Sequence, residues 1–139
     1  MKYLKKDNKY IVRIDKGEEV IEQIKRICND NNIKAGSITG LGATDRVKVG
    51  LFNTKTKEYI SKELNDAFEI TSLVGNISRM DNEVYLHLHI NVADEKLNVY
   101  GGHLNYCYIS ATCELTIEEI DVDVDREFSG EIGLNLYKM

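Results

Sequence analysis

The alternation of apolar and polar side chains between Val84 and Val92 restricts the fold of this chain more than any other feature. Positions 84, 86, 88, 90 and 92 are all aliphatic, whereas tyrosine, two histidines and asparagine lie between them. A period of two is typical of a β-strand with one face on a hydrophobic core. The opposite face then carries His87 and His89 side by side, about 6–7 Å apart along the strand.

The third histidine of the chain follows soon after this predicted strand. A polar loop at 93–95 and a short run at 97–100 lead to Gly101 and Gly102, which directly precede His103. We expect the two glycines to form a turn with backbone angles closed to other residues, and so to bring His103 to the face of the first two histidines. Three imidazoles in this arrangement can bind a metal ion. H-x-H pairs also occur as surface or hydrogen-bonded residues, so the spacing alone leaves both interpretations open.

Only one segment has the pattern of an amphipathic helix. Its apolar residues form a single stripe at helical spacing: Val20, Ile21, Ile24, Ile27 and Cys28. Asp15 and Glu18 have the spacing of a capping box at its start, and the polar run at 29–32 predicts its end. We expect the stripe to be structural.

The remaining sequence has the pattern of strands and turns. Strands are expected at 9–14, 33–41, 47–51, 58–64, 68–78, 84–92, 106–124 and 132–136. Gly40 and Gly42 favour a bulge or a close approach of two backbones, because no helix follows them as a nucleotide-binding loop would require. A change of parity near 118–119 predicts a second bulge. The chain is therefore expected to be a single α+β domain over residues 1–139, with one helix packed on a largely antiparallel sheet of about seven or eight strands.

Charge and composition exclude several functions. The net charge is −5 and the basic residues are scattered, so nothing attracts this chain to nucleic acid or to an anionic membrane over long distances. No segment approaches the ~18 apolar residues of a membrane span, and the first residues lack the apolar region of a signal peptide. We expect a cytoplasmic protein with no membrane partner.

Two further groups of residues are alternative candidates for metal ligands. The three cysteines have no C-x-x-C spacing and are expected to pack in the core, with Cys113 as a minor alternative ligand. Asp121, Asp123 and Asp125 could attract a hard cation, but they lack the glycine and the final glutamate of a calcium loop. A solvated strand edge is the favoured interpretation of this aspartate row.

Several motifs together make the chain resemble the stand-alone prokaryotic form of the plants-and-prokaryotes-conserved (PPC) domain. They are ITGLGA at 38–43, EY at 58–59, SLVGNIS at 72–78, HLH at 87–89, GGHL at 101–104 and ATCEL at 111–115. HLH followed by GGHL is the most specific pair. The resemblance extends over nearly the whole chain and implies the α+β fold described above.

The resemblance also implies a homotrimer and a metal site. It assigns His87, His89 and His103 as ligands of zinc or another divalent transition metal, and Gly101 and Gly102 as the turn that presents the third ligand. Asn76 and Glu114 match family positions, either as groups that orient the imidazoles or as structural hydrogen-bonding residues, and we favour the structural role. Plant members carry an AT-hook with the sequence R-G-R-P, which this proline-free chain lacks.

Three functions are therefore open at this point. The first is a trimeric metal-binding protein with a small-molecule site, and the second is a DNA-associated regulator, although specific DNA binding is not expected without the AT-hook. The third is an interaction scaffold with a structural metal. A trimer would also cover apolar residues and tyrosines that one helix cannot reach, such as Tyr100, Tyr106 and Tyr108. The candidates for a general base are Glu114, Asp94 and Glu95, and none is convincing, so whether the protein is an enzyme is left open.

Overall fold

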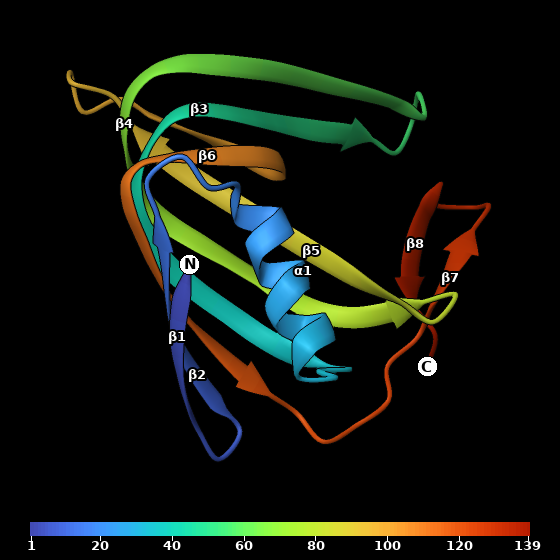
Figure 1. Ribbon diagram of the computed structural model, residues 1–139. Coiled ribbons are helices and arrows are strands. Elements are labelled where there is room, and N and C mark those ends of the chain that lie inside the picture. Colours follow the sequence, from blue (N-terminus) through green and yellow to red (C-terminus); the bar gives the residue numbers. More distant parts are fainter.

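The computed structural model describes residues 1–139 and contains eight strands and one helix (Figure 1). The elements are, in order, β1 (Lys2–Lys6), β2 (Lys9–Asp15), α1 (Val20–Asp30), β3 (Gly36–Asn53), β4 (Glu58–Met80), β5 (Glu83–Ala93), β6 (Val99–Glu119), β7 (Arg126–Ser129) and β8 (Leu134–Tyr137). The predicted α+β class with one helix and a largely antiparallel sheet is confirmed. The single helix has eleven residues, too few to span a bilayer.

Six strands form one antiparallel sheet in the order β1-β2-β6-β3-β4-β5, and β7 pairs with β8 in a separate hairpin. The start of β6 also pairs with the end of β5, so that β3, β4, β5 and β6 form a closed ring of pairings. This closure explains why residues from β5 and β6 meet on one surface. Asp81 and Asn82 connect β4 to β5 with positive φ angles of 53° and 67°, as a tight two-residue hairpin requires.

Two of the strands are longer than predicted. β3 is continuous where the sequence predicted strands at 33–41 and 47–51, and β4 likewise joins two predicted strands. The pairing of β3 with β4 shifts register between Gly40 and Gly42, which confirms the predicted bulge. A Cβ atom at Gly42 would lie 2.3 Å from the carbonyl oxygen of Thr112, so only glycine allows the backbones to approach this closely.

One cluster of 25 buried residues forms the core between α1 and the inner face of the sheet. Val20, Ile24, Ile27 and Cys28 supply the helical part, as the predicted stripe requires. Val84, Leu88, Ile90 and Val92 supply the predicted aliphatic face of β5, each at most 8% exposed. The two periodicities therefore placed the core correctly on both elements.

The start of the helix differs from the prediction. The Glu18 carboxylate accepts a hydrogen bond from the backbone N–H of Asp15 at 2.8 Å, but this contact closes the turn before α1. The N-cap is Glu19, whose carboxylate accepts from the backbone N–H of Glu22 at 2.8 Å. The predicted end is confirmed, because α1 ends at Asp30 and Asn31 is the C-cap.

The prediction that the strand beginning near 106 continues through 120–124 was wrong. β6 ends at Glu119, and the next residues form an irregular connection in which the N–H of Ile120 bonds the carbonyl oxygen of Ala35. The change of parity marks the end of the strand and not a bulge. β1 and β7 were not predicted at all, because both are short and largely exposed strands that carry little apolar alternation.

Candidate metal centre

Strands β5 and β6 bring the three histidines together on the outer face of the sheet, away from the core. His89 lies directly opposite His103 in the pairing of the two strands, and His87 is two residues before His89. His87 and His103 are half-buried, and His89 is exposed. The predicted placement of His87 and His89 on one strand face is confirmed, and His103 reaches the same face.

The imidazoles are close enough to share one ligand. Ring centroids are 5.1 Å apart for His87 and His89, 5.4 Å for His87 and His103, and 5.7 Å for His89 and His103. One nitrogen from each ring lies within 4.8 Å of the other two. This is the only group of three or more histidine, cysteine or acidic side chains in the protein with its ligand atoms so close.

The expected Gly-Gly turn is absent. Gly101 and Gly102 lie within β6 and neither has a positive φ angle, whereas the loop before them turns at Leu97 with φ 65°. The glycines are needed for space: a Cβ at Gly101 would lie 2.6 Å from the carbonyl oxygen of Ile90, and one at Gly102 would lie 2.7 Å from that of Gly50. They allow β6 to pass between β5 and β3, which places His103 opposite His89.

Tyr59 and Asn105 border the histidines beside His103. The ring of Tyr59 lies edge-on to the His103 imidazole with 6.3 Å between centroids, and its hydroxyl donates to Oδ1 of Asn105 at 2.8 Å. Gly50 pairs with His103, and a Cβ atom at Gly50 would lie 2.2 Å from the Tyr59 hydroxyl oxygen. The tyrosine side chain therefore packs against the backbone of Gly50, which has no side chain. Sequence analysis identified Tyr59 only as part of the EY motif and assigned it no role.

Arg126, the first residue of β7, borders the histidines beside His87. The hairpin β7–β8 stands next to the end of β4 (Figure 1), and the guanidinium Nη2 donates to Oδ1 of Asn76 at 2.9 Å. Asn76 is the β4 residue that pairs with His87. No pattern in the sequence indicated Arg126, because its position depends on a hairpin whose first strand was not predicted.

The environment favours the neutral form of His87 and of His103. Burial lowers the pKa of His87 below the ordinary 6.5, and the neighbouring His89, His103 and Arg126 lower it further. Burial also lowers the pKa of His103, with a further contribution from His89. Neutral imidazoles are the form that binds metal ions.

Three neutral nitrogen donors with no acidic neighbour fit a zinc-like ion. Zinc accepts histidine nitrogens at about 2.0–2.1 Å, and a tetrahedral arrangement at that length separates them by about 3.3 Å. The ligand nitrogens of the three imidazoles lie within 4.8 Å of one another. Three protein ligands leave one tetrahedral position for water or a small molecule.

The other proposed ligands and bases lie elsewhere. Cys113 is fully buried in the core and does not belong to the histidine group, and burial raises the pKa of its thiol to about 12. Asp121, Asp123 and Asp125 lie exposed on the irregular connection and form no metal cluster, and Asp123 pairs with Lys34 at 2.8 Å. The carboxylate of Asp94 is bound within its own loop by Asn98 and Tyr100.

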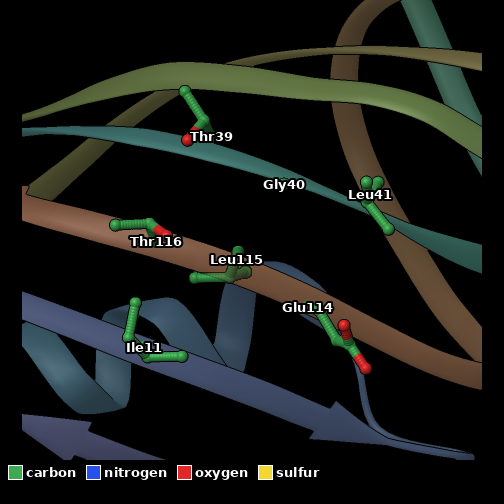
Figure 2. A pocket seen from close by; sticks show the side chains of 7 residues that line it. All are labelled: Ile11, Thr39, Gly40, Leu41, Glu114, Leu115 and Thr116. Atoms are coloured by element: carbon green, nitrogen blue, oxygen red, sulfur yellow. The ribbon is translucent and has the colours of Figure 1, made fainter.

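Glu114 lines a shallow groove of about 450 Å³ on the outer face of β2, β3 and β6 (Figure 2). Figure 2 shows Ile11, Leu41 and Glu114 around it, with Gly40 leaving the middle of β3 bare. Neither Glu114 nor Glu95 belongs to the histidine group. The structure therefore brings together the three predicted ligands and none of the predicted bases.

Known structures resemble this fold over nearly its full length. A candidate DNA-binding protein from Bacteroides thetaiotaomicron is 36% identical, with a TM-score of 0.96 and coverage of 99% of this chain and 96% of its own. A metal-containing protein from Archaeoglobus fulgidus is 30% identical, with a TM-score of 0.90 and coverage of 96% and 94%. A plant- and prokaryote-conserved (PPC) protein from Pyrococcus horikoshii is 30% identical, with a TM-score of 0.87 and coverage of 96% and 92%.

Sequence comparison leads to the same domain. A bifunctional GlmU protein from a Synechococcus strain is 26% identical over 112 residues, which are 79% of this chain but only 17% of that protein. The model of the Plants and Prokaryotes Conserved (PCC) domain matches residues 1–121. With most of its residues matched by this model and PPC proteins among its structural neighbours, the chain belongs to the Plants and Prokaryotes Conserved family.

Proposed function

We propose that the protein binds one divalent transition-metal ion per chain, with zinc the expected ion, through His87, His89 and His103, and that a fourth position accepts water or a small-molecule ligand. The observation that carries the proposal is the convergence of three imidazole nitrogens within 4.8 Å on one face. The metal content of the Archaeoglobus relative supports it.

The free fourth coordination position distinguishes the proposed site from a structural metal site. Closed structural zinc sites have four protein ligands, whereas sites that act on small molecules keep a position free. No cysteine or carboxylate stands ready as a fourth protein ligand. A bound metal would supply a Lewis acid, able to lower the pKa of a coordinated water toward 7. Copper or nickel also suits imidazole ligands, so purified protein will carry what the host supplies.

The test is metal analysis of the purified protein and of His89→Ala. We expect about one metal ion per chain in the wild type and none bound stoichiometrically in the variant, since the remaining two ligands hold zinc weakly. Asn91→Ala is the matched control, because Asn91 is the next residue on the same exposed face of β5. It should retain the metal.

The fold should survive metal removal, because the histidines lie outside the 25-residue core. Circular dichroism of His89→Ala and of chelated wild type should therefore retain the β-rich spectrum. Stoichiometric zinc in His89→Ala at neutral pH would contradict the proposal and place the metal elsewhere.

A further inference from the structure

Arg126 is a partly buried cation without an anionic partner. None of the ion pairs of the protein includes it. Nε donates to Oγ of Ser78 at 2.8 Å, Nη1 donates to the carbonyl oxygen of Asn135 at 2.9 Å, and Nη2 donates to Oδ1 of Asn76 at 2.9 Å. All three acceptors are neutral, so the positive charge stays uncompensated.

Two aromatic rings hold the guanidinium group in place. Its Cζ lies 4.6 Å from the ring centroid of Tyr85 and 4.4 Å from that of Tyr137. Tyr85 is two residues before His87 and so projects from the same outer face of β5. The group is therefore fixed next to the histidines by contacts from β4, β5 and β8, and one N–H on each terminal nitrogen has no partner in the protein.

The contact with Arg126 also fixes the side-chain amide of Asn76. Arginine only donates hydrogen bonds, so the oxygen of the amide must face it and the nitrogen must point away. This Nδ2 makes no hydrogen bond within the protein, although Asn76 is half-buried and lies directly across from His87. Cross-strand neighbours have Cβ atoms about 4.5–5.5 Å apart, which places an oriented, unused donor at the edge of the histidine cluster.

We propose that Asn76 and Arg126 form an oxyanion subsite, and that the small molecule taken up beside the three histidines is a carboxylate. One carboxylate oxygen takes the open metal position, and the other accepts from Nδ2 of Asn76 in the field of the arginine. Charge-assisted hydrogen bonds from a fixed donor pair favour an anion over a neutral molecule of the same shape. The inference rests on the proposed metal site and names the class of its ligand.

The probe is acetate, titrated into protein loaded with Co²⁺, whose visible spectrum reports on ligands at the open position. Acetamide serves as the neutral ligand of similar size. We expect acetate to change the spectrum of the wild type at much lower concentration than acetamide. Equal responses to the two would overturn the inference.

Asn76→Asp is the decisive variant. The aspartate keeps the acceptor that Arg126 binds, so a purely structural role of Asn76 predicts no loss of acetate affinity or thermal stability. The subsite predicts a loss of acetate affinity of at least about tenfold, because the donor is removed and the arginine is neutralised.

Asn105→Asp is the matched control. It adds the same charge on the other side of His103 and keeps the oxygen that accepts from Tyr59. Its acetate affinity should stay well above that of Asn76→Asp. An equal loss of affinity in both variants would mean that general charge repulsion causes it, and would refute the subsite.

Arg126→Lys, which keeps the charge but loses the planar donors, should bind acetate at an intermediate level. Absence of Co²⁺ binding in the wild type would refute the metal site itself, whereas Co²⁺ binding with unchanged acetate affinity in Asn76→Asp would refute only the subsite.

Discussion

Single glycines control how the strands that carry the histidines approach one another. A Cβ at Gly75 would lie 2.2 Å from the carbonyl oxygen of His87 and 2.9 Å from Cα of Leu88, both in the backbone of β5. Gly75→Ala must therefore push β4 and β5 apart, and we expect a loss of about 1–3 kcal/mol in the free energy of unfolding. Urea denaturation measures this loss, and metal titration should show weaker binding in the same variant.

The control for this prediction is Gly130→Ala in the β7–β8 connection. Nothing lies within 4 Å of a Cβ at Gly130, and its φ angle is not positive. Its stability should stay within about 0.5 kcal/mol of the wild type. If Gly75→Ala were equally harmless, the close approach of β4 and β5 would not limit this position.

The histidines also predict how metal binding depends on pH. Burial and the neighbouring charged groups lower the pKa of His87 and of His103 below 6.5 in the folded protein. At these two ligands metal must compete with protons only below the lowered pKa values, so occupancy should stay constant from pH 8 to about 6.5 and fall at lower pH. Equilibrium dialysis against zinc across this range measures the midpoint.

The same shifts make the metal-free protein less stable in acid. An unfolded chain binds protons at these histidines from about pH 6.5 downward, while the folded chain does not until its lowered pKa values are reached. The free energy of unfolding of the metal-free protein should therefore decrease as the pH falls through that interval. The decrease should be smaller in His87→Asn, which lacks one of these histidines. For the dialysis experiment described above, zinc binding that is unchanged at pH 5 would argue that histidine nitrogens are not the ligands.

At the scale of the elements, periodicity predicted the core better than the boundaries. The stripe of α1 and the aliphatic face of β5 follow directly from spacing, because burial selects residues at the period of the element. The lengths of β3 and β4 could not be predicted, since bulges such as that at Gly40–Gly42 preserve pairing across an apparent break in the pattern.

In the candidate site, too, local sequence patterns predicted some features and could not predict others. His87 and His89 share a face through local alternation, which a sequence shows. His103 reaches them through the pairing of β5 with β6, which was not predicted. The approach of His103 to the other histidines was predicted correctly but for a wrong reason, the supposed Gly-Gly turn. Arg126 reaches Asn76 across 50 residues, and no local pattern encodes such a contact.

One buried carboxylate links α1 to β6 in addition to the hydrophobic core. Glu19 is 6% exposed and accepts from the backbone N–H of Glu22 at 2.8 Å and from that of Cys107 at 2.9 Å. Glu19→Ala removes the cap and leaves both N–H groups without this acceptor, so we expect a loss of about 2–4 kcal/mol in the free energy of unfolding. Chemical denaturation gives the value.

Glu95→Ala provides the comparison, because Glu95 is an exposed glutamate in the loop after β5 and should change stability by less than about 0.5 kcal/mol. Glu19→Gln, which retains one acceptor oxygen, should fall between the two. Equal stability of Glu19→Ala and Glu95→Ala would show that the buried contacts of Glu19 contribute nothing.

At the scale of the whole molecule, charge argues against specific DNA recognition. The net charge is −5, and specific DNA-binding proteins place several lysines and arginines on phosphates. A fluorescence titration with duplex DNA at physiological salt should therefore show no binding tighter than about micromolar. Nanomolar affinity for any one sequence would instead support a regulatory function, in line with the description of the Bacteroides relative.

The outer face of the sheet also bears on the oligomeric state. Ile11, Thr116, Thr39, Val74 and His89 are successive partners across β2, β6, β3, β4 and β5, so they form one row on the outer face. Ile11 is 58% exposed and Val74 47%, and Leu41 beside them is 58% exposed above the groove. Tyr106 and Tyr108, which sequence analysis suggested for this role, contact Glu63 and Arg46 within the chain.

We expect this row to be covered by other copies of the chain in a homotrimer, as the family resemblance implies. Light scattering should then give three times the 15.9 kDa chain mass at micromolar concentration. Leu41→Glu places a charge in the covered face and should lower the mass toward that of one chain, because an unpaired buried charge is costly.

Leu97→Glu makes the same change in the loop before β6, where the leucine is 83% exposed, and should leave the trimer intact. A monomer mass for the wild type would contradict the trimer. If Leu41→Glu kept the trimer mass, the row would lie outside the interface, and His89 at its end would be open to solvent in the assembly.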